Sequence, residues 1–276
     1  MTYSRRIDRI HPALILLLVD QSDSMGEQVI GGGTTKAQAV AEHINTLLYE
    51  LVLRCVKTPH EPPRAYFYVG VLGYSTSGSG ESIIEQALAV ASTDGVTSTT
   101  DLAANPLRIE SRAGPSGATI NAPVWVEPVA RGGTPMCGAL NRAGRLAAGW
   151  VERHPTAFPP VIVNVSDGEA TDGDPAVWAS RLQTLSTSDG PVLLFNLSLS
   201  SDGGAASLFP SDAAGLPDRY AAKLFRMSSV LPSSMVDIAR AQGIPVRGDA
   251  RGFAFNADIK ALALFLNVGT AIGRAA

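Results

Sequence analysis

The sequence predicts an α/β fold with a mostly parallel central sheet covered by helices on both faces. Short apolar runs such as residues 13–19 have the length and the continuous hydrophobicity of strands buried on both faces. They alternate with longer stretches whose apolar residues recur every three or four positions, the spacing of one buried helix face. Strands and helices that alternate in this way form parallel sheets.

The first half of the chain begins with a predicted strand at residues 13–19. A helix is expected next, and a second strand follows at residues 66–74, so that the three elements form a strand, helix, strand unit. The buried face of the helix is predicted from Val40, Ile44, Leu47, Leu48, Leu51 and Cys55.

The second half continues the alternation. Asp174 and Pro175 predict an N-cap followed by proline at the first helical position, with the helix running to about residue 185. Another helix is predicted from the buried stripe of Leu140, Ala143, Leu146, Ala147 and Trp150. Further strands are expected at residues 124–129, 161–165, 192–197 and 252–255, and further helices at 218–225, 233–241 and 258–267.

The pattern predicts a single domain over residues 1–276, because no linker interrupts it and no internal repeat is present. The exception to short connections is an insertion at about residues 75–122, which is rich in Gly, Ser and Thr. Within it, residues 83–91 are apolar enough for a strand or a helix, and residues 100–105 favour one helical turn. Loops of this length are usually functional or carry their own structure, although a decorative surface insertion is the competing interpretation.

Composition excludes several classes of protein. The chain is 45% apolar and 17% charged, with a formal net charge of −3, so it is neither a disordered segment nor a basic nucleic-acid binder. The apolar run at residues 13–19 is too short to span a membrane and lacks a signal-peptide cleavage site. Cys55 and Cys137 make no disulfide framework, and the four histidines lack zinc spacing. A cytoplasmic protein without membrane contact is therefore expected.

Oxygen-bearing side chains gather where predicted strands end. Asp20, Ser22 and Ser24 follow the first strand at alternate positions, and Asp167 follows the strand at residues 161–165. Thr134 lies in a third loop directly before a helix. Ligands of open α/β sheets bind outside the carboxyl ends of the strands, so these three loops are expected to meet at one edge.

At several of these positions, a purely structural role competes with a role in ligand binding. Thr134, taken alone, is a good helix N-cap. Asp172 and Asp174 are interpreted as turn and capping residues, and Glu169 as a solvated loop carboxylate. Three further features are interpreted without a role in the site: Asp23, which points away by alternation, the flexible glycines 31–33, and the buried Cys137.

The oxygen-bearing residues resemble the metal-ion-dependent adhesion site of von Willebrand factor type A (vWA) domains. Asp20, Ser22 and Ser24 match the D-x-S-x-S element, Thr134 matches the threonine of the next loop, and Asp167 matches the aspartate of the third. The strings GGTP and SDGEATDG make the chain similar to stand-alone cytoplasmic bacterial vWA proteins of the TerY group. The chain departs from a minimal vWA domain in its insertion.

This resemblance implies a Rossmann-like vWA fold and a ligand set. Ser22, Ser24 and Thr134 would bind a metal directly, and Asp20 and Asp167 would support it through water. Hydroxyl and carboxylate oxygens without imidazole or thiolate suit a hard cation, which points to Mg²⁺, with Mn²⁺ or Ca²⁺ as alternatives. A Glu or Asp of a protein partner would take the open coordination position.

The expected function is a Mg²⁺-dependent protein-protein interaction module rather than an enzyme. The resemblance implies an adaptor or scaffold in a bacterial stress-response complex or one linked to a kinase or phosphatase. The alternative is a Mg²⁺-dependent hydrolase or phosphotransferase with Asp20 as nucleophile, although Ser22 stands where a second carboxylate would be expected. In a third hypothesis, the insertion makes the main partner contact and the metal is auxiliary.

Overall fold

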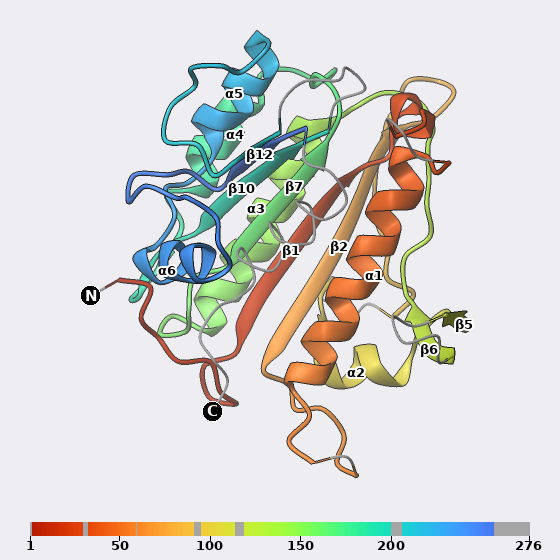
Figure 1. The fold of residues 1–276 in the computed structure, drawn as a ribbon, viewed down its shortest axis with the longest axis vertical. Coiled ribbons are helices and arrows are strands. Elements are labelled where there is room, and N and C mark those ends of the chain that lie inside the picture. Colours follow the sequence, from red (N-terminus) through yellow and green to blue (C-terminus); the bar gives the residue numbers. More distant parts are fainter. Residues whose placement is uncertain are drawn as a thin grey trace.

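An eight-stranded sheet runs through the centre of the computed structural model, which describes residues 2–29, 33–58, 60–90, 95–113, 119–199 and 206–256 (Figure 1). Its central strands are parallel, in the spatial order β12 (Phe253–Phe255), β10 (Leu193–Ser198), β7 (Val161–Ser166), β1 (Ala13–Asp20) and β2 (Phe67–Thr76). Antiparallel strands complete the sheet: β11 (Ser207–Leu208) beside β12, and β3 (Ser82–Gln86) and β4 (Thr97–Ser98) beside β2. The predicted α/β class with a mostly parallel sheet is confirmed.

Helices cover both faces of the sheet (Figure 1). Along β1, Ile15 and Leu17 pack on the side of α1 (Lys36–Arg54) and α6 (Ser233–Ala241). Leu16 and Leu18 pack on the side of α3 (Met136–Arg153), α4 (Pro175–Leu182) and α5 (Arg219–Met227). Because successive side chains of a strand point to opposite faces, a strand covered on both sides must be apolar throughout, as β1 is.

Helix α1 begins where the sequence supplies a capping box. The Thr35 hydroxyl accepts a hydrogen bond from the backbone N–H of Gln38, and the Gln38 side chain accepts one from the backbone N–H of Thr35. Such reciprocal bonds satisfy backbone donors that have no partner inside the helix. The helix then buries the predicted stripe of Val40, Ile44, Leu47, Leu48 and Leu51, and Cys55 is its C-cap.

The order of the strands reverses at β1. The chain passes from β1 through α1 to β2 on one side, and later through α3 to β7 on the other side. Asp20 at the end of β1 therefore lies close to Ser166 at the end of β7, in two neighbouring parallel strands. Such a switch point is where open α/β sheets bind ligands.

The segment at about residues 75–122 carries its own structure. It holds β3 and β4, the predicted helical turn as α2 (Thr99–Ala104), and a hairpin of β5 (Arg108–Ala113) and β6 (Thr119–Val124). Of the apolar residues predicted at 83–91, those up to Gln86 form a strand and those at 87–90 do not, while residue 91 lies outside the described residues. The insertion thus extends the sheet beyond β2 and adds a two-stranded arm.

The predicted strand at residues 124–129 is wrong. β6 ends at Val124, and Trp125 and Val126 after it lie buried in a loop. The Asn45 side chain of α1 accepts hydrogen bonds from the backbone N–H groups of Trp125 (2.8 Å) and Val126 (3.0 Å) and donates one to the Val126 carbonyl (2.9 Å). One buried side chain thus takes the place of a neighbouring strand.

The other predicted strands and helices are present with shifts of a few residues at their ends, and α4 ends at Leu182 rather than near residue 185. The predicted helix at residues 258–267 lies outside the described residues. The sequence did not predict the short 3-10 helix η1 (Asp23–Gly26) or the small hairpin of β8 (Ser186–Thr187) and β9 (Gly190–Pro191). Within the described part of the chain, every helix is too short or too polar to cross a membrane.

Candidate metal centre

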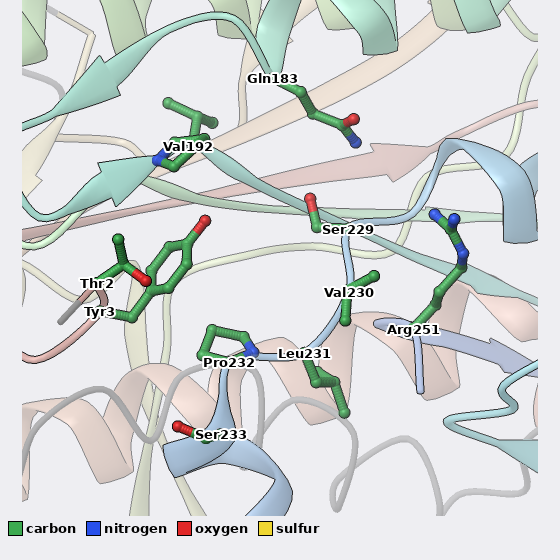
Figure 2. A pocket seen from close by; sticks show the side chains of 11 residues that line it. Thr2, Tyr3, Gln183, Val192, Ser229, Val230, Leu231, Pro232, Ser233 and Arg251 are labelled. Atoms are coloured by element: carbon green, nitrogen blue, oxygen red, sulfur yellow. The ribbon is translucent and has the colours of Figure 1, made fainter. Parts of the chain in front are cut away.

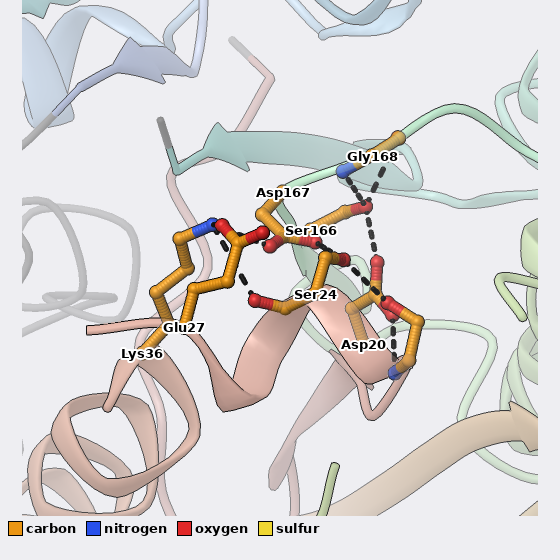
Figure 3. A network of polar contacts seen from close by, with 8 residues as sticks. Asp20, Ser24, Glu27, Lys36, Ser166, Asp167 and Gly168 are labelled. Carbon is orange, nitrogen blue, oxygen red and sulfur yellow. Dashed lines mark hydrogen bonds and ion pairs between the residues drawn. The ribbon is translucent and has the colours of Figure 1, made fainter. Parts of the chain in front are cut away.

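Asp20 is the buried centre of the site. It is the last residue of β1, and its side chain is fully shielded from solvent. Its Oδ1 accepts a hydrogen bond from the backbone N–H of Ser22 (2.9 Å), and its Oδ2 accepts one from the Ser166 hydroxyl of β7 (2.6 Å) (Figure 3). Both carboxylate oxygens are therefore fixed in place, one by the loop directly after β1 and one by the last residue of β7.

The two serines of the motif turn toward the end of β7. The 3-10 helix η1 follows Ser22 and brings the Ser22 and Ser24 hydroxyl oxygens to 3.1 Å from each other. The Ser24 hydroxyl donates a 2.7 Å hydrogen bond to Oδ1 of Asp167, whose side chain is also fully buried (Figure 3). Direct contacts thus connect Ser22, Ser24 and Asp167, and the Ser22 backbone connects them to Asp20.

Thr134 reaches the same edge of the sheet from the third loop. It is 5% exposed, and a Cβ added to Gly168 would lie 3.7 Å from its Oγ1, so its hydroxyl faces the loop that carries Asp167. Among the described residues, no direct hydrogen bond joins this hydroxyl to the other four side chains. The fold therefore brings all five predicted residues to one edge, four of them through a continuous chain of contacts.

The loop before Thr134 is attached to η1, which follows β1, and to the end of β2. Asp23 exchanges two 2.9 Å hydrogen bonds with Gly132, one through its backbone N–H and one through its carboxylate. Gly132 has φ +64°, and a Cβ there would lie only 2.3 Å from the Thr76 carbonyl oxygen. Gly133 donates a 2.7 Å hydrogen bond to the Thr76 hydroxyl. Asp23, for which the sequence predicted no role in the site, thus positions the Thr134 loop.

Thr134 is not the helix cap that its sequence context favours. The N-cap of α3 is Pro135, which offers no side-chain hydrogen bond. Instead, Asp172 reaches across from the loop after β7 and accepts hydrogen bonds from the N–H groups of Cys137 (2.9 Å) and Gly138 (2.8 Å). The capping interpretation of Asp172 is correct, but the helix is α3, and this arrangement leaves the Thr134 hydroxyl unused as a cap.

A lysine that no sequence motif indicated completes the polar network. Lys36, the first residue of α1, is 4% exposed, and its Nζ lies 2.7 Å from Oδ2 of Asp167 and 2.9 Å from Oε2 of Glu27 (Figure 3). The Glu27 side chain is 56% exposed. The only sequence signal for Lys36 was its place at the start of a helix that follows the motif loop.

The electrostatics of the site follow from this burial. Desolvation raises the pKa of Asp20 to about 6, the nearby Asp167 adds to this rise, and the hydrogen bonds from Ser166 and Ser22 oppose it. Burial also acts to lower the pKa of Lys36, but its bonds to Asp167 and Glu27 outweigh that effect, so its pKa is raised. Lys36 is therefore an ammonium in the neutral range.

The donor set fits a hard divalent cation. Among the described residues, no three His, Cys, Asp or Glu side chains gather as a metal cluster, so the candidate donors are hydroxyls with two carboxylates. Within the described part of the chain, the one buried lysine beside these two buried carboxylates is Lys36, and its ammonium contacts Asp167. This leaves one buried negative charge in excess, which is costly unless a cation or a proton compensates for it.

Glu169, Asp174 and Cys137, which lie beside the site, have the structural roles that the sequence predicted. Glu169 is a half-exposed carboxylate with a long contact (3.9 Å) to Arg219. Asp174 caps α4 by accepting a hydrogen bond from the N–H of Ala176 (3.2 Å). Cys137 is buried, and desolvation together with Asp172 raises the pKa of its thiol to about 12. The glycines at 31 and 32 lie outside the described residues.

A separate cavity of about 520 Å³ lies away from this edge (Figure 2). Tyr3, Val192 before the start of β10, Ser229 and Arg251 are among the residues that line it. The Arg251 guanidinium donates to the Ser228 carbonyl (2.6 Å). None of the five predicted site residues borders this cavity.

Comparison with known proteins supports the fold class. No family model and no curated protein sequence matches the chain. The chain is similar in structure to the pilus adhesin SpaC from Lactobacillus rhamnosus GG, with a TM-score of 0.51 and 12% identity over 97% of this chain and 32% of that one. It therefore spans about a third of SpaC. A likeness at this level of identity shows the fold alone.

Two other solved structures give lower scores. For manganese-loaded TRAP protein from Plasmodium vivax, the TM-score is 0.42 and the identity 14%, over 93% of this chain and 74% of that one. For the PilB minor pilin from Streptococcus sanguinis, the TM-score is 0.48 and the identity 10%, over 96% of this chain and 62% of that one.

Fold and site together define an α/β domain with an oxygen-lined site at the switch point of its sheet.

Proposed function

We propose that this chain is a vWA-type interaction module whose metal-ion-dependent adhesion site binds Mg²⁺. The observation that carries the proposal is the pair of fully buried carboxylates, Asp20 and Asp167, beside paired serine hydroxyls, with Lys36 as the one buried ammonium among the described residues. A divalent cation there offers a positively charged, electrophilic position to a carboxylate of another molecule. Ser22, Ser24 and Thr134 would hold it, and Asp20 and Asp167 would support it.

The partner in this proposal is a protein that presents an Asp or Glu side chain. The resemblance to TerY-like proteins supports a bacterial cytoplasmic setting, in a stress-response complex or one linked to a kinase or phosphatase. SpaC, which shares the fold, is itself described as a pilus adhesin. Both comparisons support a role in binding rather than in turnover.

The geometry of Asp20 also supports binding over catalysis. Its side chain is fully buried, and hydrogen bonds from Ser22 and Ser166 engage both of its oxygens. A nucleophilic carboxylate needs an oxygen that can reach substrate. A phosphatase assay with a generic substrate and Mg²⁺ tests this directly, and steady turnover that Asp20→Asn abolishes would favour the enzyme hypothesis.

Thermal unfolding with and without Mg²⁺ tests the metal site. A ligand that binds only the native state raises the melting temperature as its concentration increases. Mg²⁺ is therefore expected to stabilise the native protein and to leave Asp20→Ala unchanged. Asp237→Asn is the matched control, because this carboxylate is 75% exposed on α6 and should retain the full response. A native protein that does not respond to Mg²⁺ would refute the proposal.

A pull-down of the partner with this chain as bait distinguishes binding through the metal site from binding through the insertion. The β5–β6 hairpin exposes Ile109 (56%), so Ile109→Ser changes the surface of the insertion without opening the core. If the metal site makes the main contact, Asp20→Ala or EDTA abolishes capture and Ile109→Ser does not. The reverse result would make the insertion the principal contact and the metal auxiliary.

A further inference from the structure

The Lys36 ammonium occupies an unusual position next to the candidate metal ligands. Its Nζ lies 2.7 Å from Oδ2 of Asp167, while the other oxygen of that carboxylate accepts the Ser24 hydroxyl at 2.7 Å. The same Nζ lies 3.5 Å from the backbone carbonyl of Ser24. Both oxygens of Asp167 are therefore engaged by this chain's own groups.

Burial makes this ion pair significant. The side chains of Lys36 and Asp167 are 5% and 0% exposed, whereas the second partner of Lys36, Glu27, is 56% exposed. An exposed carboxylate is screened by water and contributes little, but a buried pair is screened much less. The charge of Lys36 therefore acts mainly on Asp167 and on whatever the neighbouring hydroxyls hold.

Resting on the proposed function, we propose that Lys36 is an internal counterion that keeps the metal-free site assembled and weakens its affinity for Mg²⁺. Without a metal, its ammonium compensates the buried charge of Asp167, so the loops after β1 and β7 stay together. With a metal, the same ammonium repels the cation and competes for Asp167. The site then exchanges its metal instead of holding it permanently.

The repulsion is also large enough to measure. Two unit charges about 5 Å apart at an effective dielectric constant near 20 interact strongly enough to change an equilibrium constant by roughly a few hundredfold, and the interaction energy doubles for a divalent cation. Relaxation and the loss of the bond to Asp167 reduce the net effect. We expect Lys36→Met to bind Mg²⁺ at least about tenfold more tightly than the native protein.

The test is a calorimetric Mg²⁺ titration of the native protein, Lys36→Met and Lys36→Arg, with melting curves in EDTA. Lys36→Met should melt lower than native in EDTA, because it leaves Asp167 buried without its counterion. It should gain more stability from Mg²⁺ and show the tighter affinity. Lys36→Arg keeps the cation and should resemble the native protein in both measurements.

A double variant distinguishes the effect of the lost charge from simple misfolding. Lys36→Met combined with Asp167→Asn removes both charges, so it should recover stability in EDTA without the gain in Mg²⁺ affinity. Unchanged or weaker Mg²⁺ binding by Lys36→Met, while the native protein binds Mg²⁺ and Asp20→Ala does not, would overturn the role of Lys36 alone. A native protein that binds no Mg²⁺ would overturn the proposed function and this inference with it.

Discussion

The Ser166 hydroxyl donates a 2.6 Å hydrogen bond to Oδ2 of Asp20, across the pair of strands where the order of the sheet reverses. Both side chains are fully buried. Ser166 also lies within 3.2 Å of the N–H and the carbonyl of Gly168. One hydroxyl thus joins the carboxylate of the D-x-S-x-S motif to the loop that carries Asp167.

Ser166→Ala is expected to weaken the site and the fold together. Loss of a partner to a buried carboxylate should reduce the free energy of unfolding by about 1–3 kcal/mol, measured by urea denaturation in EDTA. Mg²⁺ affinity should fall as well, because the Ser166 bond lowers the pKa of Asp20 and its loss strengthens proton competition. Ser180→Ala, which removes an exposed helix hydroxyl, is the control and should stay within about 0.5 kcal/mol of native. A similar small change for Ser166→Ala would contradict this prediction.

The raised pKa of Asp20 predicts how stability depends on pH. Its pKa is about 6 in the folded chain, above the ordinary 3.8 of an aspartate, so between these values the native state holds more protons than the unfolded state. The free energy of unfolding of the metal-free protein should therefore fall as the pH rises from about 4 to about 6, by up to about 3 kcal/mol relative to Asp20→Asn. Denaturation of the two proteins across this range measures the difference. Parallel curves would show that Asp20 titrates normally.

Asp172 is expected to stabilise the contact between the loop after β7 and the start of α3. Its carboxylate caps α3 from the loop after β7, so Asp172→Ala should reduce the free energy of unfolding by about 1–2 kcal/mol. Asp174→Ala, which removes the cap of α4 and an exposed contact to Lys223 of α5, should lower stability by about 1 kcal/mol but leave Mg²⁺ affinity unchanged. If Asp172 also holds the Thr134 loop near Asp167, only its variant should bind Mg²⁺ more weakly. Equal effects of the two variants on metal binding would contradict this.

Outside the site, substitution of Asn45 is expected to have the largest effect on stability. Asn45→Ala would leave the buried backbone groups of Trp125 and Val126 without partners, at a cost of about 2–4 kcal/mol. Asn105→Ala, whose side chain makes one exposed bond on α2, is the matched control and should cost less than about 0.5 kcal/mol. Urea denaturation measures both. Comparable values for the two variants would show that the loop does not depend on Asn45.

Asn45 also shows where prediction from sequence reaches its limit. Apolar runs and helical spacing predicted the central strands and nearly every helix, because burial on two faces leaves a strong local pattern. The run at residues 124–129 carries the same pattern, yet its backbone partner is a side chain about 80 residues earlier in the chain. No local signal distinguishes such a loop from a strand.

The candidate site was predictable for a different reason. Asp20, Ser22, Ser24, Thr134 and Asp167 all lie at ends of elements on one edge, and the alternation of strands and helices is enough to place that edge. Lys36, Ser166 and Asp23 act through partners distant in sequence or through backbone groups, so their residue types alone did not reveal them. The supporting contacts emerge only in three dimensions.

The most direct test of the central claim is an anomalous diffraction measurement on crystals of the chain grown with Mn²⁺ in place of Mg²⁺. We expect one anomalous peak per chain at the edge between β1 and β7, within direct coordination distance of the Ser22 and Ser24 hydroxyl oxygens. Thr134 should contribute a third hydroxyl, and Asp20→Ala crystals should lack the peak. A peak elsewhere, or none at saturating Mn²⁺, would contradict the assignment of these residues as a metal centre.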